Sequence, residues 1–239
     1  MFKKVVFTGG ACGGKSSIIE SLKNKVNSIT TPEPAWIVFG LQQKLNFKFN
    51  SFDRQWLIFN LHVLFEYWAE DKTQNNEVIL MDRSILDNSV FTNVDQYNYL
   101  FNRYRIGSIK NNYSTVVYCK SIAHNKANEF KMLRQFADIE QTKEIDLKLL
   151  KAYESCPNII YNTKDSLAER IEESFIVLKN VKPAKSSMHS LINKDTLNLI
   201  IKDSKIIMSK YNIKNELQNY ILSPILKKQN KYLDSINQL

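Results

Sequence analysis

The residues best suited to chemistry in this sequence form the run from Gly9 to Ser16. This run fits the pattern G-x-x-x-x-G-K-[ST], in which glycines let backbone N–H groups turn inward around a phosphate. The predicted phosphate-binding residues are Gly9, Gly10, Ala11, Cys12, Gly13, Gly14, Lys15, Ser16 and Ser17. The ligand that this pattern predicts is a nucleoside triphosphate, ATP or GTP, together with Mg²⁺.

Two residues of this loop carry specific roles. Lys15 is expected to reach the β- and γ-phosphates, and the Ser16 hydroxyl is expected to ligate Mg²⁺. Ser17 should lie one residue into the following helix, near the α-phosphate. A glycine-rich turn with an incidental lysine is the alternative. The strand-like run before the loop and the helical run after it favour the phosphate loop instead.

A second candidate group follows the apolar run 78–81, where Asp82 and Arg83 come next. A carboxylate at the carboxyl end of a buried parallel strand lies beside the phosphate loop. Asp82 is therefore a candidate to hold Mg²⁺ through water or to orient the attacking group. Arg83 supplies a planar fork for a phosphate or a substrate hydroxyl. The alternative is a solvated Asp-Arg pair that simply ends a strand.

A third candidate is Glu33, which lies between two prolines in the segment 31–36. If the run 28–31 is a strand, Glu33 projects from the same edge of the sheet as Asp82. A carboxylate there is a candidate base for an acceptor hydroxyl, and Trp36 could form a wall for a planar ring. Alternatively, Glu33 complements the amino end of the next helix and Trp36 packs in the core.

A fourth candidate is the basic stretch after the run 114–119. A flexible basic segment can close over a triphosphate and stabilise transition-state charge, although a solvated lysine-bearing loop explains it equally well. We select Arg134 as its catalytic member. The basic residues are Lys120, His124, Lys126, Lys131 and Arg134.

Weaker signals come from two other places. The segment 162–165 reads Asn-Thr-Lys-Asp, but its spacing differs by one residue from the guanine-reading signature Asn-Lys-x-Asp. Glu66 and Trp68 are candidates to line an acceptor pocket, although core packing explains Trp68 as well.

Short β-like runs alternate with helical runs, which is typical of a parallel sheet with crossover helices. We expect an α/β, three-layer P-loop NTPase fold with a five-stranded parallel sheet and a short helical C-terminal extension. Residues 1–180 are predicted to form a P-loop nucleotide-binding, kinase-like domain, and 181–239 a linker and helical tail. Strands are predicted over 4–8, 28–31, 77–81, 114–119 and 158–161, and helices over 15–25, 35–45, 53–73, 85–104, 139–153, 166–179, 195–211 and 214–237.

Composition narrows the class of protein. The chain has 239 residues, and none of its apolar runs approaches the length of a membrane-spanning helix, roughly 18–20 residues. Its three cysteines are widely spaced, without a metal-ligand pattern. We therefore expect a soluble protein of a reducing compartment, the cytoplasm, without a signal peptide. The net charge of +9 suits polyphosphates, and equally a nucleic acid or an anionic membrane, for which the sequence shows no motif.

These motifs resemble a known family. The loop with its preceding Thr8 is similar to the T-G-G-P-x-x-G-K-T loop of the AAA-type domain shared by NadR-like proteins and the TRPL translocation defect proteins. The segment 82–87 resembles the D-R-G-x-x-D element of that family, with Ser84 in place of glycine. Arg134, Glu140 and the run 145–153 resemble its later helix. The resemblance covers about residues 2–178 and implies a kinase-like P-loop domain.

A second resemblance is to deoxynucleoside kinases. Pro32-Glu33-Pro34 is similar to their Glu-Pro element, which supplies the base, and Asp82-Arg83-Ser84 to their Glu-Arg-Ser. The chain departs from them in having Asp82 where they carry Glu. Its basic stretch also has one arginine where they usually carry several.

The sequence thus predicts a Mg²⁺-dependent phosphotransferase of the nucleoside- or nucleotide-kinase type, acting on an unidentified small-molecule acceptor. The alternative is a slow NTPase or nucleotide-dependent switch that binds a protein, ribonucleoprotein or membrane partner. In that case the C-terminal tail is the candidate for partner binding or self-association. A nucleic-acid-binding protein ranks last.

Overall fold

The protein is built on a parallel sheet of five strands in the order β2-β3-β1-β4-β5. The computed structural model describes residues 1–74, 77–121 and 139–223. The register pairs Phe7 of β1 with Asp82 of β3, so the two strands end side by side. This places the loop after β1 next to the residues after β3. The strands are β1 (Lys3–Thr8), β2 (Ser28–Thr31), β3 (Val78–Asp82), β4 (Thr115–Cys119) and β5 (Ile159–Asn162).

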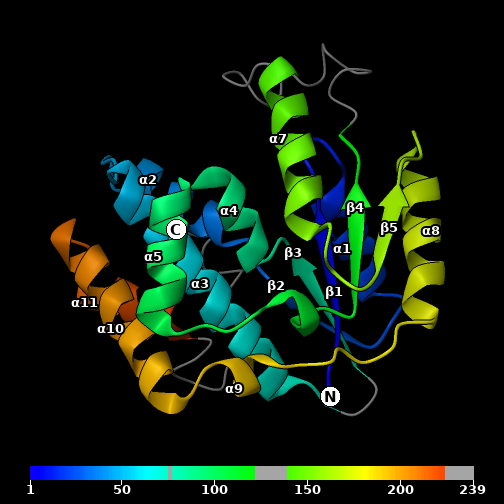
Figure 1. Ribbon diagram of the computed structural model, residues 1–239. Coiled ribbons are helices and arrows are strands. Elements are labelled where there is room, and N and C mark those ends of the chain that lie inside the picture. The colour runs from blue at the N-terminus through cyan, green and yellow to red at the C-terminus, as the bar shows by residue number, and fades with distance from the viewer. Residues whose placement is uncertain (75–76, 122–138, 224–239) are drawn as a thin grey trace.

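Helices cover both faces of the sheet (Figure 1). Side chains of β1 alternate between the faces, so Val5 and Phe7 pack toward α1 and α8 while Val6 packs toward α3. The expected three-layer α/β fold with five parallel strands is confirmed. The remaining elements are α1 (Lys15–Lys23), α2 (Pro34–Lys44), α3 (Ser51–Lys72), η1 (Ile85–Asp87), α4 (Asn88–Phe91), α5 (Val94–Tyr104), η2 (Lys110–Asn112), α7 (Ile139–Tyr153), α8 (Leu167–Lys179), α9 (Met188–Leu191), α10 (Lys194–Lys210) and α11 (Asn215–Ile221).

Helix α3 runs through the larger of the two hydrophobic cores. Its amino end is capped by Asn50, whose side chain accepts a hydrogen bond from the Asp53 N–H at 2.8 Å. Apolar residues lie on nearly every side of its middle turns, as expected for a helix that packs on a sheet and on other helices. Within the described residues, no helix is both long and apolar enough to cross a membrane.

The single helix predicted over 85–104 is wrong. The chain instead forms η1, α4 and α5, with a break at Thr92 and Asn93. Ser84 caps η1 in a capping box with Asp87, and Asn93 caps α5 by accepting from the Gln96 N–H at 2.8 Å. Short polar side chains that hydrogen-bond to the nearby backbone favour new helix starts over helix continuation. The capping box also fixes Asp87, whose carboxylate accepts from the Ser84 N–H at 2.9 Å and from Thr8 Oγ1 at 2.7 Å.

The described part of the C-terminal tail packs on α3. Met188, Ile200 and Met208 are buried in the same hydrophobic core as Leu57. Asp203 of α10 also accepts two hydrogen bonds from the Arg103 guanidinium, at 2.6 and 2.8 Å. Residues 188–223 therefore form part of the main core. The boundary at residue 180 stays a prediction, and residues 224–237 of the last predicted helix lie outside the described chain.

Candidate functional site

The loop after β1 has the backbone of a phosphate cradle. Gly9 has φ +126° and Gly14, which precedes α1, has φ +77°, both in the region that glycine adopts without strain. A Cβ on Gly9 would lie 2.1 Å from the Cys119 carbonyl oxygen, so the loop and β4 approach as closely as they do only because Gly9 lacks a side chain. Cys12 takes up a positive φ of 59°. The N–H groups at the start of α1 face this loop, which suits an anion.

Three side chains from distant parts of the chain hold the loop in place. The Asp146 carboxylate accepts from the Gly10 N–H at 2.6 Å, and Ser121 Oγ donates to the Ala11 carbonyl at 2.5 Å. Arg170 Nη1 donates to the Gly13 carbonyl at 2.7 Å. Sequence reasoning assigned no role to any of the three. Asp146 lies in the run used for the family resemblance, but nothing in the sequence indicates that it contacts Gly10.

Lys15 is the first residue of α1, and its side chain points back to the phosphate loop. Its side chain is buried, and Nζ donates to the carbonyls of Gly9 at 3.1 Å and Gly10 at 2.8 Å. Burial, together with the nearby Arg83 guanidinium, lowers the pKa of the Lys15 ammonium. An anionic ligand in the loop would oppose that shift, because an opposite charge favours the ammonium form. Ser17, the next residue but one, is exposed on the first turn of α1.

The predicted metal residues meet. Ser16 Oγ donates to Asp82 Oδ2 at 2.6 Å, and the second carboxylate oxygen, Oδ1, is buried without a hydrogen-bond partner among the described residues. The described chain has no group of three or more His, Cys, Asp or Glu side chains that could hold a metal. Mg²⁺ fits this donor set, because it is commonly held by one or two protein oxygens together with water and substrate phosphates.

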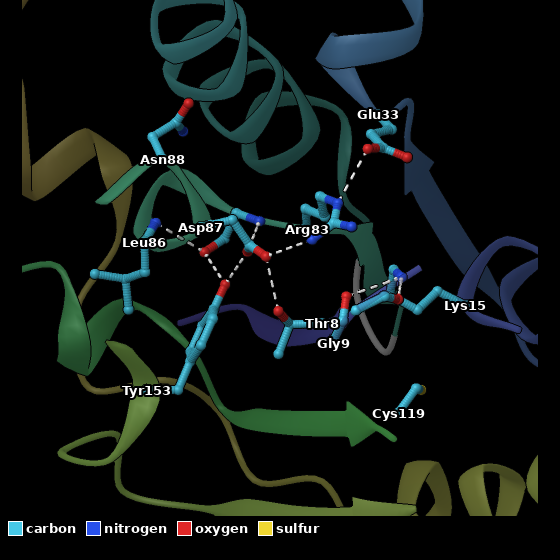
Figure 2. Close-up of polar contacts among 12 residues, drawn as sticks. Thr8, Gly9, Lys15, Glu33, Arg83, Leu86, Asp87, Asn88, Cys119 and Tyr153 are labelled. Atoms are coloured by element: carbon cyan, nitrogen blue, oxygen red, sulfur yellow. Dashed lines mark hydrogen bonds and ion pairs between the residues drawn. The ribbon is translucent and has the colours of Figure 1, made fainter. Parts of the chain in front are cut away.

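Glu33 and Arg83 form an ion pair across the sheet edge (Figure 2). Glu33 Oε1 accepts from Arg83 Nε at 3.0 Å, and the other side of the guanidinium donates from Nη1 to Asp87 Oδ1 at 2.9 Å. Arg83 has φ +69°, a sparsely populated conformation for a residue with a side chain. Such backbone strain persists only where neighbouring structure enforces it, and it is common at functional sites.

Asp87 is the residue around which the polar contacts of the site converge (Figure 2). Besides Arg83, it accepts from Thr8 Oγ1 at 2.7 Å, from the Ser84 N–H at 2.9 Å and from the Tyr153 hydroxyl. It is almost fully buried. The sequence placed Asp87 only within a family motif, and its contacts depend on the capping box that starts η1 at Ser84.

The pKa shifts follow from this packing. Burial raises the pKa of the Glu33 carboxyl, which Asp82 also raises and Arg83 and Lys15 oppose. The surrounding carboxylates raise the pKa of the Arg83 guanidinium despite its burial, so it stays charged. The site therefore combines a fixed cation with a carboxylate that is more basic than an ordinary glutamate, which suits proton acceptance.

A cavity of about 220 Å³ opens beside this pair. Its wall includes Ala11 of the phosphate loop, so loop and cavity are continuous. This volume lies below the roughly 300–1,000 Å³ typical of drug-sized ligands, so the cavity admits one small molecule. The lining residues are Ala11, Glu33, Ala35, Phe39, Gln55, Ile58, His62, Arg83, Asp87, Asn88, Phe91, Gln141, Thr142 and Ile145.

Several sequence-based expectations fail at this cavity. Trp36 is 58% exposed and neither lines the cavity nor packs in the core. Glu66 and Trp68 also do not line it; the residues of α3 that do are Gln55, Ile58 and His62. Spacing on a long buried helix did not indicate which of its faces meets the cavity.

The basic stretch and Asn162 remain to be placed. Arg134 and most of the basic stretch lie outside the described residues, so its catalytic role stays a prediction. Asn162 has a structural role, since its side chain amide donates to the Arg170 carbonyl at 2.9 Å and ties β5 to α8.

Glu66 is a buried carboxyl that hydrogen-bonds to residues after β3 and before β4. It accepts from the Ile85 N–H at 3.3 Å, the Tyr113 hydroxyl at 3.1 Å and the Asn112 amide at 3.2 Å. Burial raises the pKa of Glu66 to about 7, with Lys4 as the main opposing influence.

This shift predicts a pH-dependent stability. A carboxyl whose pKa is raised in the folded state stabilises the fold fully below its unfolded pKa, about 4.5, and loses that contribution as pH rises through about 7. The loss amounts to roughly 3 kcal/mol in the free energy of unfolding. Urea denaturation at pH 5 and pH 8 should therefore show a smaller pH difference in Glu66→Gln than in the wild type. Equal pH differences would contradict the assignment, and Glu154→Gln, at an exposed position, is the control.

Comparison with known proteins identifies a family and two solved structures of similar fold. The family described as AAA domain matches residues 4–170. Deoxyadenosine kinase from M. mycoides, solved with products dCMP and a flexible dCDP bound, is 16% identical with a TM-score of 0.55 and covers 74% of this chain and 100% of its own. The NadR protein in complex with NR is 13% identical with a TM-score of 0.56 and covers 78% of this chain and 53% of its own. No curated protein matches the sequence.

These likenesses confirm both resemblances drawn from the motifs, at the level of family and fold. At such low identities they show a shared P-loop, kinase-like fold and leave the reaction to be argued from the site.

Proposed function

The chain belongs to the AAA domain family, and on that premise we propose that it is a Mg²⁺- and NTP-dependent phosphotransferase acting on a nucleoside or nucleotide. The observation that carries this proposal is the Glu33–Arg83 pair, which lines a small cavity continuous with the phosphate loop. A nucleotide switch needs the loop but has no use for a basic carboxylate in an adjoining cavity. The two solved relatives, bound to dCMP and to NR, support a small-molecule acceptor.

The donor site is the loop from Gly9 to Ser16. Its backbone N–H groups would hold the β-phosphate, with Lys15 at the β- and γ-phosphates. The contacts of Asp146, Ser121 and Arg170 keep the loop in its shape, so little ordering is needed on binding. The remaining residues proposed to contact the phosphates are Gly10 to Gly14 within the loop and Ser17 after it. The sequence and the site leave ATP and GTP as equal candidates for the donor.

Ser16 and Asp82 would hold Mg²⁺, directly or through water. When bound, this ion neutralises the charge that develops on the phosphate oxygens. The unpartnered Oδ1 of Asp82 supports this assignment, because a buried carboxylate oxygen without a donor is costly unless a ligand satisfies it.

The acceptor hydroxyl would lie in the cavity beside Glu33. Its oxygen forms a bond to the γ-phosphorus as the bond from that phosphorus to the β–γ bridging oxygen breaks. The hydroxyl proton passes to the Glu33 carboxylate, and the nucleoside diphosphate leaves. Arg83, held on its other side by Asp87, would orient the acceptor and offset negative charge on the transferring group. Arg134 remains the candidate for a further cation at the phosphates.

The alternative function, a slow NTPase or switch, also has an observation in its favour. Helix α7 contacts the loop through Asp146 and the Asp87 network through Tyr153. A nucleotide that changed the conformation of the loop would therefore displace α7 as well. The fate of the γ-phosphate separates this alternative from the kinase function.

The fate of the γ-phosphate tests the proposal. Purified protein is incubated with Mg²⁺ and γ-labelled ATP or GTP, alone and with a panel of nucleosides and nucleoside monophosphates. We expect label to move to one class of acceptor at a rate far above the release of free phosphate. Label found only as slowly released free phosphate, whichever acceptor is present, would contradict phosphotransfer and favour the switch.

A further inference from the structure

One wall of the acceptor cavity is a single face of helix α3. Gln55, Ile58 and His62 follow one another at spacings of three and four residues, so they lie on the same side of the helix. Ile58 is apolar, whereas Gln55 and His62 are polar side chains that are both buried. A buried polar side chain in a cavity wall needs a hydrogen-bond partner. Neither the phosphate loop nor the Glu33–Arg83 pair uses these two residues.

The contacts of His62 determine which ring nitrogen carries the proton. Its Nδ1 lies 2.9 Å from the Asn88 side chain amide nitrogen, which also donates to the Ile85 carbonyl at 3.2 Å. That carbonyl can only accept, so the Asn88 nitrogen is an NH₂ donor and Nδ1 must be an acceptor. In the neutral ring the proton is then on Nε2.

The ring is neutral near physiological pH. Burial lowers the pKa of His62 to about 4, an effect that Arg83 reinforces and Asp87 opposes. Its Nε2–H is therefore a fixed, uncharged donor. This nitrogen is buried and has no hydrogen-bond partner among the described residues.

We propose that His62 reads the acceptor, by donating its Nε2–H to an uncharged ring nitrogen or carbonyl oxygen of a planar heterocycle held in this cavity. This inference rests on the proposed function and assigns the residue of the cavity that selects the base of the acceptor. His62 lines the cavity and its Nε2–H has no partner among the described residues, so a ligand without an acceptor for it leaves the N–H unpaired.

The rest of the wall suits a flat ring. Phe39 and Phe91 line the same cavity and offer aromatic surface, and Ile58 adds an apolar side chain. Arg83 lies over the Phe91 ring, with 5.5 Å between the guanidinium carbon and the ring centroid, which helps to keep that ring in position. Glu33 and Arg83, also in the wall, would then meet the polar end of the same ligand that carries the hydroxyl.

The first test reads the ring directly, without any ligand. Nitrogen-15 NMR of the histidine side chains should show His62 as the neutral Nε2–H form from pH 5.5 to pH 8. The partly exposed His189 serves as the internal comparison. An Nδ1–H form, or titration of His62 between pH 6 and pH 7, would overturn the inference even if the protein is a kinase.

The second test uses ligands that lack one ring acceptor at a time. The probes are 2′-deoxyadenosine, 2′-deoxyguanosine and 2′-deoxycytidine, their deaza analogues, in which C–H replaces a ring nitrogen, and a 2′-deoxycytidine analogue without the 2-carbonyl oxygen. In the wild type, removing the atom that His62 contacts should weaken binding roughly ten- to hundredfold, as measured by calorimetry. Analogues altered at other positions should bind like the parent compound.

Two variants complete the design. His62→Phe keeps a ring of similar size but has no donor, so parent and analogue should bind equally. His62→Gln can supply an N–H and should restore part of the difference, while His189→Phe should leave it unchanged. Persistence of the full difference in His62→Phe, or its absence in the wild type, would refute the role of His62.

Failure of the kinase function and failure of the role of His62 would give different results. If no nucleoside or nucleoside monophosphate binds and none receives label, the nucleoside- or nucleotide-kinase function fails, and the role of His62 fails with it. If a nucleoside is phosphorylated but acceptor atoms make no difference, only the inference about His62 fails.

Discussion

Replacing Lys15 with alanine is expected to lower NTP turnover by roughly 10²- to 10³-fold or more and to weaken nucleotide binding. Lys15 Nζ is buried at the loop, where it contacts the carbonyls of Gly9 and Gly10. Alanine removes the charge that the phosphates would meet. The loop itself should persist, because the contacts from Asp146 and Arg170 do not involve Lys15.

Titration with a fluorescent ATP or GTP analogue measures the affinity of Lys15→Ala, and release or transfer of labelled phosphate measures its turnover. Lys23→Ala is the matched control, since Lys23 lies on the same helix and forms an exposed ion pair with Glu20. A melting temperature close to that of the wild type would show that the fold is intact. Unchanged affinity in Lys15→Ala would remove the loop from the donor site.

The second large effect is expected at Glu33. Glu33→Gln should lower phosphoryl transfer roughly 10²- to 10⁴-fold while donor affinity stays within a small factor of the wild type. Glutamine keeps the shape of the side chain but cannot accept the hydroxyl proton as a carboxylate does. Arg83 should remain in place, because Asp87 holds the other side of its guanidinium.

The pH profile separates a lost base from a lost structural contact. Burial raises the pKa of Glu33 above that of an ordinary glutamate, so transfer in the wild type should fall as pH decreases through that raised pKa, as the base becomes protonated. This acid limb should be absent from the residual activity of Glu33→Gln. Glu20→Gln, exposed on α1, is the control. Full transfer by Glu33→Gln, or an unchanged acid limb, would show that another group is the base.

Local pattern was sufficient for the phosphate loop of the candidate site. The phosphate loop is contiguous in sequence, and its function depends on backbone N–H groups and on two adjacent side chains, so the motif carries its own geometry. The alternation of apolar runs was likewise enough for the five-stranded parallel sheet, because each β–α unit is local. The proximity of Asp82 to Ser16 followed from the rule that parallel strands end at one edge.

The cavity beside the loop was decided by tertiary structure. The interpretation of 85–104 as one helix was wrong, since capping by Ser84 and Asn93 competes with a periodicity that looks continuous. The capping box at Ser84 holds Asp87 where its carboxylate accepts from Arg83 and Thr8. The exposure of Trp36 is a similar case, because an aromatic residue at helical spacing does not reveal whether another element covers it.

The amino-acid sequence by itself determined the fold class, the phosphate loop and the carboxylates at the sheet edge, because these depend on contacts between neighbours in the chain or on the regular geometry of strands. Only the tertiary structure decided which face of α3 forms the cavity, that Asp146 and Arg170 brace the loop, and which nitrogen of His62 bears the proton. Gly10 and Asp146 are 136 residues apart, and Gly13 and Arg170 are 157 residues apart. Contacts at such separations depend on how all the intervening elements pack, and residue type or periodicity alone does not specify that packing.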